Sequence, residues 1–598
     1  MFKTLLFRRT AQKEQQNSQH INGKPSDSLP LKVSLASFWR MLKPYWTCKD
    51  SLISWILLIV IIALTAGSIW IATSINSWYK TFWDTIQNYD VDAFKHQILI
   101  FAVLASIHVV VTVYKAFLQS RLAINWRRWL TGKVMNEWLE KSTYYKLQLT
   151  DKNTDNPDQR IADDLSLFVN ATIVLFLGTT TDLAMMVTFA VVLWDLSGSV
   201  DLTLWNGYVL HLPDGYLLYL ALIYSVAGTL ITFVLGKPLV KLNFRQQRYE
   251  ADFRFSLIRV RENAESIALY KGEEIENLTL RERFFNVVKN YISLINCQKR
   301  LGFLTLGYAQ LAVIFPILIA APLYFSKIIT MGSIMQINSA FGQVQSALST
   351  LVANFSDWAS WKAVIDRLAL FFDGMERADN FKCIKAQKDG VQFKVENLEV
   401  KTQSGEVLGK NVSFCLNLGD SLLIRGPSGC GKSTIIRTIA GIWPFSSGKV
   451  TEPASGEVLF LSQKPYLPQG TLREAAGYPK APETQGLTEK YFKALNLEHL
   501  LPLLDKEDIW SHILSLGEQQ RVAFVRALLL KPKLLFLDEA SSALDERSEN
   551  IAYSLIKEEL KDSIIVSVGH RSSLIAKHDF ALSCVDGKWE FSRRELIA

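Results

Sequence analysis

Long apolar runs recur through the N-terminal part of the chain. Five of them approach or exceed the roughly 17–25 residues with which a helix crosses a bilayer. They are Leu52–Ile75, Ile98–Tyr114, Phe168–Trp194, Tyr216–Leu235 and Leu301–Phe325. A sixth run, Met331–Trp361, is interrupted by Gln and Asn residues and by Asp357, and we interpret it as a span whose polar stripe faces a water-filled path. The pattern predicts six transmembrane helices.

A different pattern begins after residue 390. Ser421–Arg425, Leu534–Leu537 and Ile564–Val568 are short apolar runs typical of buried strands, and strands that alternate with helices indicate a parallel sheet. The predicted fold is an α-helical membrane domain of six transmembrane helices fused to an α/β phosphate-loop domain. The predicted parts are a disordered cytoplasmic tail (1–30), the transmembrane domain (31–375), a linker (376–390) and the α/β domain (391–598).

The charges orient the predicted spans. Lys and Arg gather in the N-terminal tail and after the second and fourth apolar runs, whereas residues 195–215 contain neither. Excess positive charge marks the cytoplasmic side, so both termini are expected in the cytoplasm, and the two basic segments are expected to be helices extending into the cytosol. With 49% hydrophobic and 20% charged residues and a net charge of only +8, the composition excludes an ordinary soluble enzyme. It favours a lipid bilayer, and no nucleic acid, as partner.

The chain has six cysteines, none of them in a CxxC pair: Cys48, Cys297, Cys383, Cys415, Cys430 and Cys584. On the predicted topology all lie on the cytoplasmic side. We interpret them as reduced thiols that form neither disulfides nor a zinc site.

A phosphate-binding loop follows the first predicted strand. The residues that fit GxxxxGK[ST] are Gly426, Pro427, Ser428, Gly429, Cys430, Gly431, Lys432 and Ser433. The glycines allow a tight turn whose N–H groups point at phosphates, and the helix that follows adds its positive end. Lys432 would reach the β- and γ-phosphates, the Ser433 hydroxyl would bind Mg²⁺, and Thr434 would bind a phosphate oxygen. The loop therefore predicts ATP and Mg²⁺ as cofactors.

Four further polar residues follow apolar strands. Asp538 would hold Mg²⁺, and Glu539 would act as the general base that polarises the attacking water. Gln463 would touch Mg²⁺ or that water. His570 would contact the γ-phosphate.

Together with Leu514–Arg521 (LSLGEQQR) and Ser542–Asp545 (SALD), these motifs resemble ATP-binding cassette transporters over residues 391–598. The resemblance implies that one cassette's signature, Ser515, Leu516, Gly517 and Glu518, acts in trans on another cassette's phosphate loop. It also implies a dimer-interface loop at Ser542 and Asp545, and a switch histidine at His570. Leu516 and Glu518 depart from the commonest signature, and Thr402 occupies the position of the usual adenine-stacking aromatic residue.

The membrane half resembles subfamily D of these transporters. The motifs are Asn76–Trp78, Phe82–Asp84, Arg127–Trp129, Asn156–Arg160 and Arg259–Glu274. That subfamily includes peroxisomal fatty-acyl transporters and bacterial proteins that take up cobalamin, peptide antibiotics and other hydrophilic solutes. Because the chain carries one motif set, the resemblance implies an ATP-driven homodimeric half-transporter of an unidentified solute, in a bacterial inner membrane.

Other functions remain open. A lipid or drug exporter shares the fused architecture, and an ATP-gated regulator of another membrane protein would carry the same motifs. A cassette ATPase acting on nucleic acid is disfavoured by the spans. Within the third span, Asp182 is costly to bury in lipid, so it is either a cavity residue or the partner of a neighbouring helix.

Overall fold

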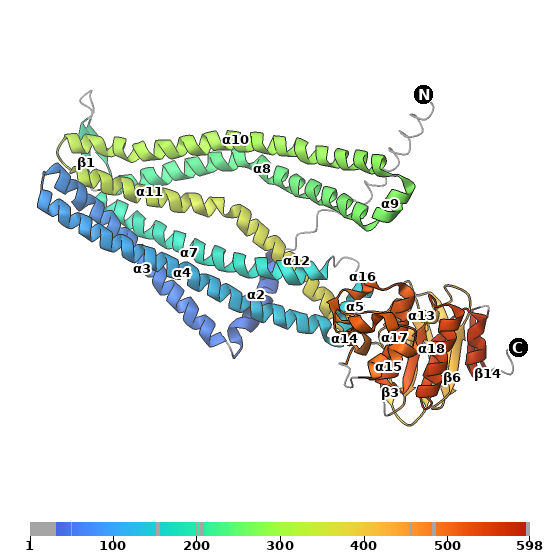
Figure 1. The fold of residues 1–598 in the computed structure, drawn as a ribbon. Helices are drawn as coiled ribbons and strands as arrows, with labels where there is room; N and C mark the ends of the chain where they lie inside the picture. The colour runs from blue at the N-terminus through green and yellow to red at the C-terminus, as the bar shows by residue number, and fades with distance from the viewer. Residues whose placement is uncertain are drawn as a thin grey trace, which may run out of the picture. The chain divides into compact units, whose positions relative to one another are not determined.

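The computed structural model consists of two compact units (Figure 1). It describes residues 31–49, 51–150, 156–197, 200–203, 209–454, 457–480, 486–585 and 587–593. The predicted tail, residues 1–30, lies outside the described residues. One unit, here the helical unit, comprises residues 1–135 and 156–371, and the other, the α/β unit, comprises residues 136–155 and 372–598.

Among its described residues, the helical unit contains long and short helices, a π-helical turn (Arg160–Asp164) and one hairpin of β1 (Val200–Thr203) and β2 (Val209–Leu212). The helices are α2 (Leu31–Thr47), α3 (Ser51–Gln87), α4 (Val91–Leu139), α6 (Pro157–Gln159), α7 (Leu165–Leu196), α8 (Tyr216–Glu262), α9 (Ala264–Tyr270), α10 (Glu273–Phe325), α11 (Met331–Ala353) and α12 (Phe355–Asn380).

Five helices among the described residues, α3, α4, α7, α8 and α10, are long and apolar enough to cross a membrane, and they contain the five predicted uninterrupted spans. Three of them are much longer than a bilayer. α4, α8 and α10 have 49, 47 and 53 residues, or about 70–80 Å at 1.5 Å per residue, against about 30 Å of hydrocarbon. The basic segments are thus helical continuations of spans, as predicted, and α8 and α10 run side by side (Figure 1).

The sixth predicted span, at α11, is not among these five and stays a prediction. α11 packs against α3, α7, α8 and α10. Its Ile337, Phe341 and Val344 are buried in a core with Phe189 of α7 and Leu217 of α8. A helix that neighbours cover needs a less continuous apolar surface than one that faces lipid, which accounts for its weaker pattern.

Polar groups fix α11 against α3. The Asn76 side chain donates to the carbonyl oxygen of Gln336 (3.0 Å), and Asp84 accepts from the backbone N–H of Gly332 (3.0 Å). A Cβ on Gly332 would lie 2.0 Å from the carbonyl oxygen of Lys80, so only glycine allows this approach. Both motifs near the end of α3 therefore serve helix packing.

The Asn156–Arg160 motif leads into an ion-pair cluster. Asp164 is only 2% exposed and accepts from Arg160 (2.6 Å) and from Nη2 and Nε of Arg367 in α12 (2.7 and 2.9 Å). Such bidentate pairs fix geometry as well as charge, so they join the start of α7 to α12.

The α/β unit contains the predicted sheet. Its strands are β3 (Gln387–Lys388), β4 (Phe393–Lys401), β5 (Val407–Leu416), β6 (Ser421–Arg425), β7 (Ser446–Glu452), β8 (Val458–Leu461), β9 (Gly470–Thr471), β10 (Glu507–Asp508), β11 (Leu534–Asp538), β12 (Ile564–Val568), β13 (Phe580–Val585) and β14 (Lys588–Arg593). Its helices include α5 (Thr143–Thr150), α13 (Lys432–Ile439), α14 (Leu472–Gly477), α15 (Leu487–Ala494), α16 (Trp510–Ile513), α17 (Leu516–Leu530) and α18 (Glu546–Glu559).

Six strands form one sheet in the order β14-β13-β6-β12-β11-β8, parallel except for the edge strand β14. Side chains alternate between its faces. Leu534 and Phe536 pack in a cluster with Ile435 of α13, whereas Leu535 and Leu537 join the cluster that contains α17 and α18. Burial of both faces explains the continuous apolar runs from which these strands were predicted.

One segment of the predicted membrane domain belongs to the other unit in the structure. Residues 136–155 belong to the α/β unit: Lys141 pairs with Asp379 (3.2 Å), and Leu149 packs against the cluster of α13. The sequence assigns them to the membrane domain because a helix that continues from a span shows no break in composition. β3 lies within the predicted linker, and the domain limits remain predictions.

Candidate functional site

The carboxyl ends of four parallel strands gather the predicted residues at one edge of the sheet. β6, β12, β11 and β8 are neighbours that run in the same direction. The phosphate loop follows β6, His570 follows β12, Asp538 ends β11 and Gln463 follows β8. Ligands of open α/β sheets bind at this edge.

The phosphate loop owes its path to glycines with left-handed φ angles. The φ angles are 155° at Gly426, 83° at Gly429 and 100° at Gly431, and residues with a side chain rarely adopt such angles. Lys432 begins α13, and its ammonium donates to the carbonyl oxygens of Gly426 (2.9 Å) and Pro427 (2.8 Å). The loop thus holds a positive charge at the start of a helix, as phosphate binding requires. Ser428 and Cys430 lie in this loop, and Thr434 in the first turn of α13.

Two predicted magnesium ligands lie together. The Ser433 hydroxyl donates to Asp538 Oδ1 (3.0 Å). Burial, with the nearby charge of Glu539, raises the pKa of the Asp538 carboxyl even though Ser433 stabilises its charged form. Hydroxyl and carboxylate oxygens are hard donors that suit Mg²⁺, so the residues present fit that ion. Gln463, the third predicted ligand, has an exposed side chain beyond β8.

Glu539 and His570 also come together. Glu539 Oε1 lies 3.2 Å from His570 Nε2, and the Glu539 N–H donates to the carbonyl oxygen of Val568 (3.1 Å). Glu539 has a φ of 50°, a conformation that non-glycine residues adopt at a cost of about 1–3 kcal/mol and that clusters at functional sites. The predicted base and the predicted switch histidine are therefore paired at the sheet edge.

The signature residues form the amino end of α17. Ser515 is the N-cap: its hydroxyl accepts from the N–H of Glu518 (3.4 Å), and the Glu518 carboxylate accepts from the N–H of Ser515 (2.9 Å), which makes a capping box. The same carboxylate accepts from the Ser515 hydroxyl (2.7 Å). Glu518 also contacts His499 (2.8 Å). A Cβ on Gly517 would lie 3.1 Å from the carbonyl oxygen of Ala543, and Leu516 is exposed. Glu518 thus holds Ser515 in place.

Gln520, to which the sequence assigned no role, connects three parts of the site. It is fully buried, and its side-chain amide donates to the carbonyl oxygen of Gln463 (2.8 Å) and to the hydroxyl of Ser542 (3.1 Å). Its oxygen accepts from the N–H of Ala543 (2.9 Å). The signature helix, the Gln463 loop and the Ser542 loop are therefore tied together.

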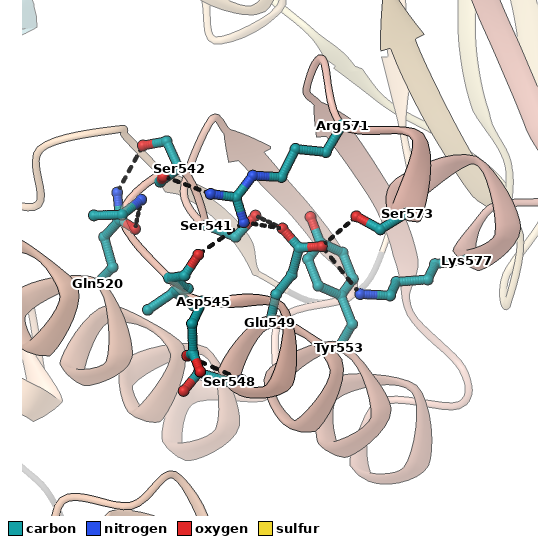
Figure 2. Close-up of polar contacts among 12 residues, drawn as sticks. Gln520, Ser541, Ser542, Asp545, Ser548, Glu549, Tyr553, Arg571, Ser573 and Lys577 are labelled. Carbon is teal, nitrogen blue, oxygen red and sulfur yellow. Dashed lines mark hydrogen bonds and ion pairs between the residues drawn. The ribbon is translucent and has the colours of Figure 1, made fainter.

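A buried carboxylate, Glu549, organises the other side of this loop (Figure 2). It is fully buried and accepts hydrogen bonds from Ser541 (2.9 Å) and Ser573 (2.7 Å), with Arg571 and Lys577 both at 3.3 Å. Although burial favours the neutral form, the hydrogen bonds from Ser573 and Ser541 and the charge of Lys577 hold the pKa of Glu549 below its ordinary value.

Arg571 and Asp545 complete the loop. Arg571 donates to the carbonyl oxygens of Leu544 (2.7 Å) and Ser542 (2.9 Å), and Asp545 caps α18 by accepting from the N–H of Ser548 (3.2 Å) (Figure 2). Since Arg571 directly follows His570, the predicted interface loop is joined to the histidine segment.

Comparisons with known proteins agree with this arrangement. Residues 41–325 match the family described as ABC transporter transmembrane region 2, and residues 409–542 match the ABC transporter family. An uncharacterized ABC transporter ATP-binding protein of Haemophilus influenzae is 37% identical over 92% of this chain and 93% of its own length. The chain belongs to the ABC transporter family.

Two further comparisons refine this assignment. The "ABC transporter D family member 2, chloroplastic" of Arabidopsis thaliana is 33% identical over 93% of this chain and 87% of its own length. The solved structure of a bacterial Atm1-family ABC exporter with ATP bound has a TM-score of 0.68 and covers 92% of this chain and 96% of its own. At 17% identity it shows a shared fold alone. The chain is an ABC half-transporter of subfamily D type, an ATPase coupled to transport across a membrane.

In the helical unit of this transporter, Asp182 has a cationic neighbour. Lys115 of α4 interacts electrostatically with Asp182, and its ammonium lies 3.4 Å from the Thr181 hydroxyl on α7. Lys115 directly follows the second apolar run, so the sequence pattern alone does not place it beside Asp182. Thr402 lies in the turn between β4 and β5, where its carbonyl oxygen accepts from the N–H of Gly405 and its hydroxyl shares a hydrogen bond with that of Ser404.

Proposed function

We propose that this half-transporter works as a homodimer with two composite ATP sites. One site combines the phosphate loop of one copy with Ser515, Leu516, Gly517 and Glu518 of the other, and the Ser542–Asp545 loop lies at the interface. The proposal is supported by the single motif set of the chain and by the capping box that holds Ser515 at the amino end of α17, next to Gly517. ATP would favour the closed pair, which converts binding energy into motion.

Within each site, individual residues bind the phosphates or take part in hydrolysis. Lys432 and the loop N–H groups bind the phosphates, Glu539 accepts the proton of the attacking water, and His570 holds Glu539 and contacts the γ-phosphate. Ser433, Asp538 and Gln463 would hold Mg²⁺, which would supply positive charge against the phosphates. The observation that carries this proposal is the placement of the Ser433–Asp538 and Glu539–His570 pairs at one sheet edge.

We propose a hydrophilic solute, such as a cobalamin or a peptide, taken up across a bacterial plasma membrane. Asp182, a charge within the third apolar run, supports a polar solute, because charges within spans are retained mainly for function. α11 would provide the sixth span, which leaves both termini in the cytoplasm. A bacterial relative supports the choice of membrane.

Transport in proteoliposomes tests the proposal. The vesicles would be preloaded with a cobalamin, a cationic peptide or an acyl-CoA, and ATP would be added outside, so that only copies with outward-facing α/β units run. ATP-dependent loss of preloaded solute indicates transport toward the cytosolic side, as proposed. The Glu539→Gln variant should abolish it.

Other outcomes contradict parts of the proposal. Accumulation of external solute would indicate export, including that of lipids or drugs, and movement of acyl-CoA alone would contradict the hydrophilic solute. ATPase activity without movement of any solute, together with a co-purifying membrane protein, would favour an ATP-gated regulator.

A further inference from the structure

Two cysteines lie against each other behind the phosphate loop. Cys430 is a half-buried residue of the loop, and Cys584, on β13, is 6% exposed. A Cβ on Gly426 would lie 2.9 Å from Cys430 Sγ and 2.7 Å from Cys584 Cβ, so both side chains pack against the same face of that glycine. Burial, together with charge and hydrogen-bond interactions with Cys430, raises the pKa of the Cys584 thiol. The two thiols are therefore direct neighbours.

Other cysteines have different surroundings. Cys48 Sγ lies 3.0 Å from the carbonyl oxygen of Tyr45, and Cys415 Sγ lies 3.5 Å from Gln392 Oε1. Cys48 and Cys297 belong to the helical unit, whereas Cys430 and Cys584 both belong to the α/β unit.

The two cysteines differ in how freely they can move. Cys584 sits on a strand that pairs with β6 on one side and β14 on the other. Cys430 lies between Gly429 and Gly431, whose left-handed φ angles set the path of the loop. A bond between the sulfurs would therefore draw the loop toward the sheet, and the N–H groups that bind phosphate would shift with it.

We propose that Cys430 and Cys584 form a reversible redox site that switches off the ATP site. Hydrogen peroxide oxidises the Cys430 thiol to a sulfenic acid and releases one water. The Cys584 thiol then attacks that sulfur, which forms the disulfide and releases a second water. The two electrons pass from the sulfurs to the peroxide, and a small thiol restores both cysteines by exchange. This inference rests on the ATPase part of the proposed function and not on its solute or direction.

The test uses the full chain in detergent, in which the other cysteines are replaced as C48S, C297S, C383S and C415S. Dilute hydrogen peroxide should yield a peptide pair linked through Cys430 and Cys584, lighter by two hydrogens than the separate peptides. ATPase activity should fall at least about tenfold, because displaced backbone donors are worth that much or more. Dithiothreitol should remove the link and restore the activity.

The matched variant adds Cys584→Ala to that background, with Cys584→Ser as a second version should alanine impair folding. Each should keep its basal ATPase activity, form no linked peptide, and retain activity at the peroxide dose that silences the parent. Equal inactivation of the variants, inactivation of the parent without the link, or a link without inactivation would each overturn the proposal. Absence of ATPase activity before oxidation would instead contradict the proposed catalytic roles, while the linked peptide still tests the cysteine pair.

Discussion

The two units use their polar residues differently. In the helical unit, Asn76, Asp84 and Asp164 contact neighbouring helices or their caps. In the α/β unit, Gln520 and Glu549 hold loops at a sheet edge where Ser433, Asp538, Glu539 and His570 meet. Lipid offers no hydrophobic drive for helices to associate, so packing and hydrogen bonds must join them.

In water, apolar burial already holds the α/β unit together, because both faces of its sheet are covered. Its polar residues are therefore available to shape a ligand site. This difference implies that substitutions of polar residues affect nucleotide chemistry in the α/β unit and mainly helix packing in the helical unit.

Among the variants that test this difference between the units, Lys432→Ala is expected to have the largest effect. Removing a charged donor from the phosphate loop should weaken ATP binding by about 1.5–3 kcal/mol, or roughly 10- to 150-fold. Titration of the detergent-solubilised protein with a fluorescent ATP analogue measures this. Lys449→Ala, at an exposed lysine of β7, is the control and should bind normally. Equal affinity of both variants would contradict the phosphate contact.

A smaller effect is expected from Glu549→Ala. This substitution removes the carboxylate that accepts from Ser541, Ser573, Arg571 and Lys577. The free energy of unfolding should fall by about 1–3 kcal/mol, and ATPase activity should fall with it because the Ser542–Asp545 loop loosens. Since its folded-state pKa is lowered, the contribution of Glu549 is present at neutral pH and lost as pH falls through that pKa.

Thermal unfolding and ATPase assays measure both effects. Glu558→Ala, an exposed glutamate of the same helix, should change neither. A Glu549→Ala protein with normal stability and turnover would show that the network is incidental.

The smallest change in stability is expected from Asp182→Asn. An interhelical polar contact in a membrane contributes about 0.6 kcal/mol, so Tm should hardly move. If Asp182 lines the solute path, transport should nevertheless fall while ATPase activity persists, and Lys115→Gln should do the same. Full transport by Asp182→Asn would assign Asp182 to helix packing, like Asp164.

Much of the fold follows from local sequence signals. The five uninterrupted spans and the parallel strands were predicted because continuous apolar runs are required both by lipid and by a sheet covered on two faces. α11 was harder, since its neighbours shield it and its pattern is mixed. The grouping of residues 136–155 with the α/β unit leaves no local signal, because it depends on contacts distant in sequence.

The residues of the candidate site also divide into those with a local sequence signal and those without one. The phosphate loop, Asp538, Glu539 and His570 follow strands directly, so their convergence could be predicted from strand direction. Gln520, Glu549 and Arg571 were missed, because their partners are brought near only by folding. The positions of Gln520 inside the signature helix and of Arg571 beside His570 were the available signals.

Glu539 is proposed as the base of an ATP-hydrolysing site at the sheet edge. The most direct test measures ATP binding and hydrolysis by Glu539→Gln in the purified full chain beside the wild type. Loss of a general base should slow hydrolysis about 10²–10⁴-fold while ATP affinity stays near normal. Hydrolysis at close to the wild-type rate would contradict the account.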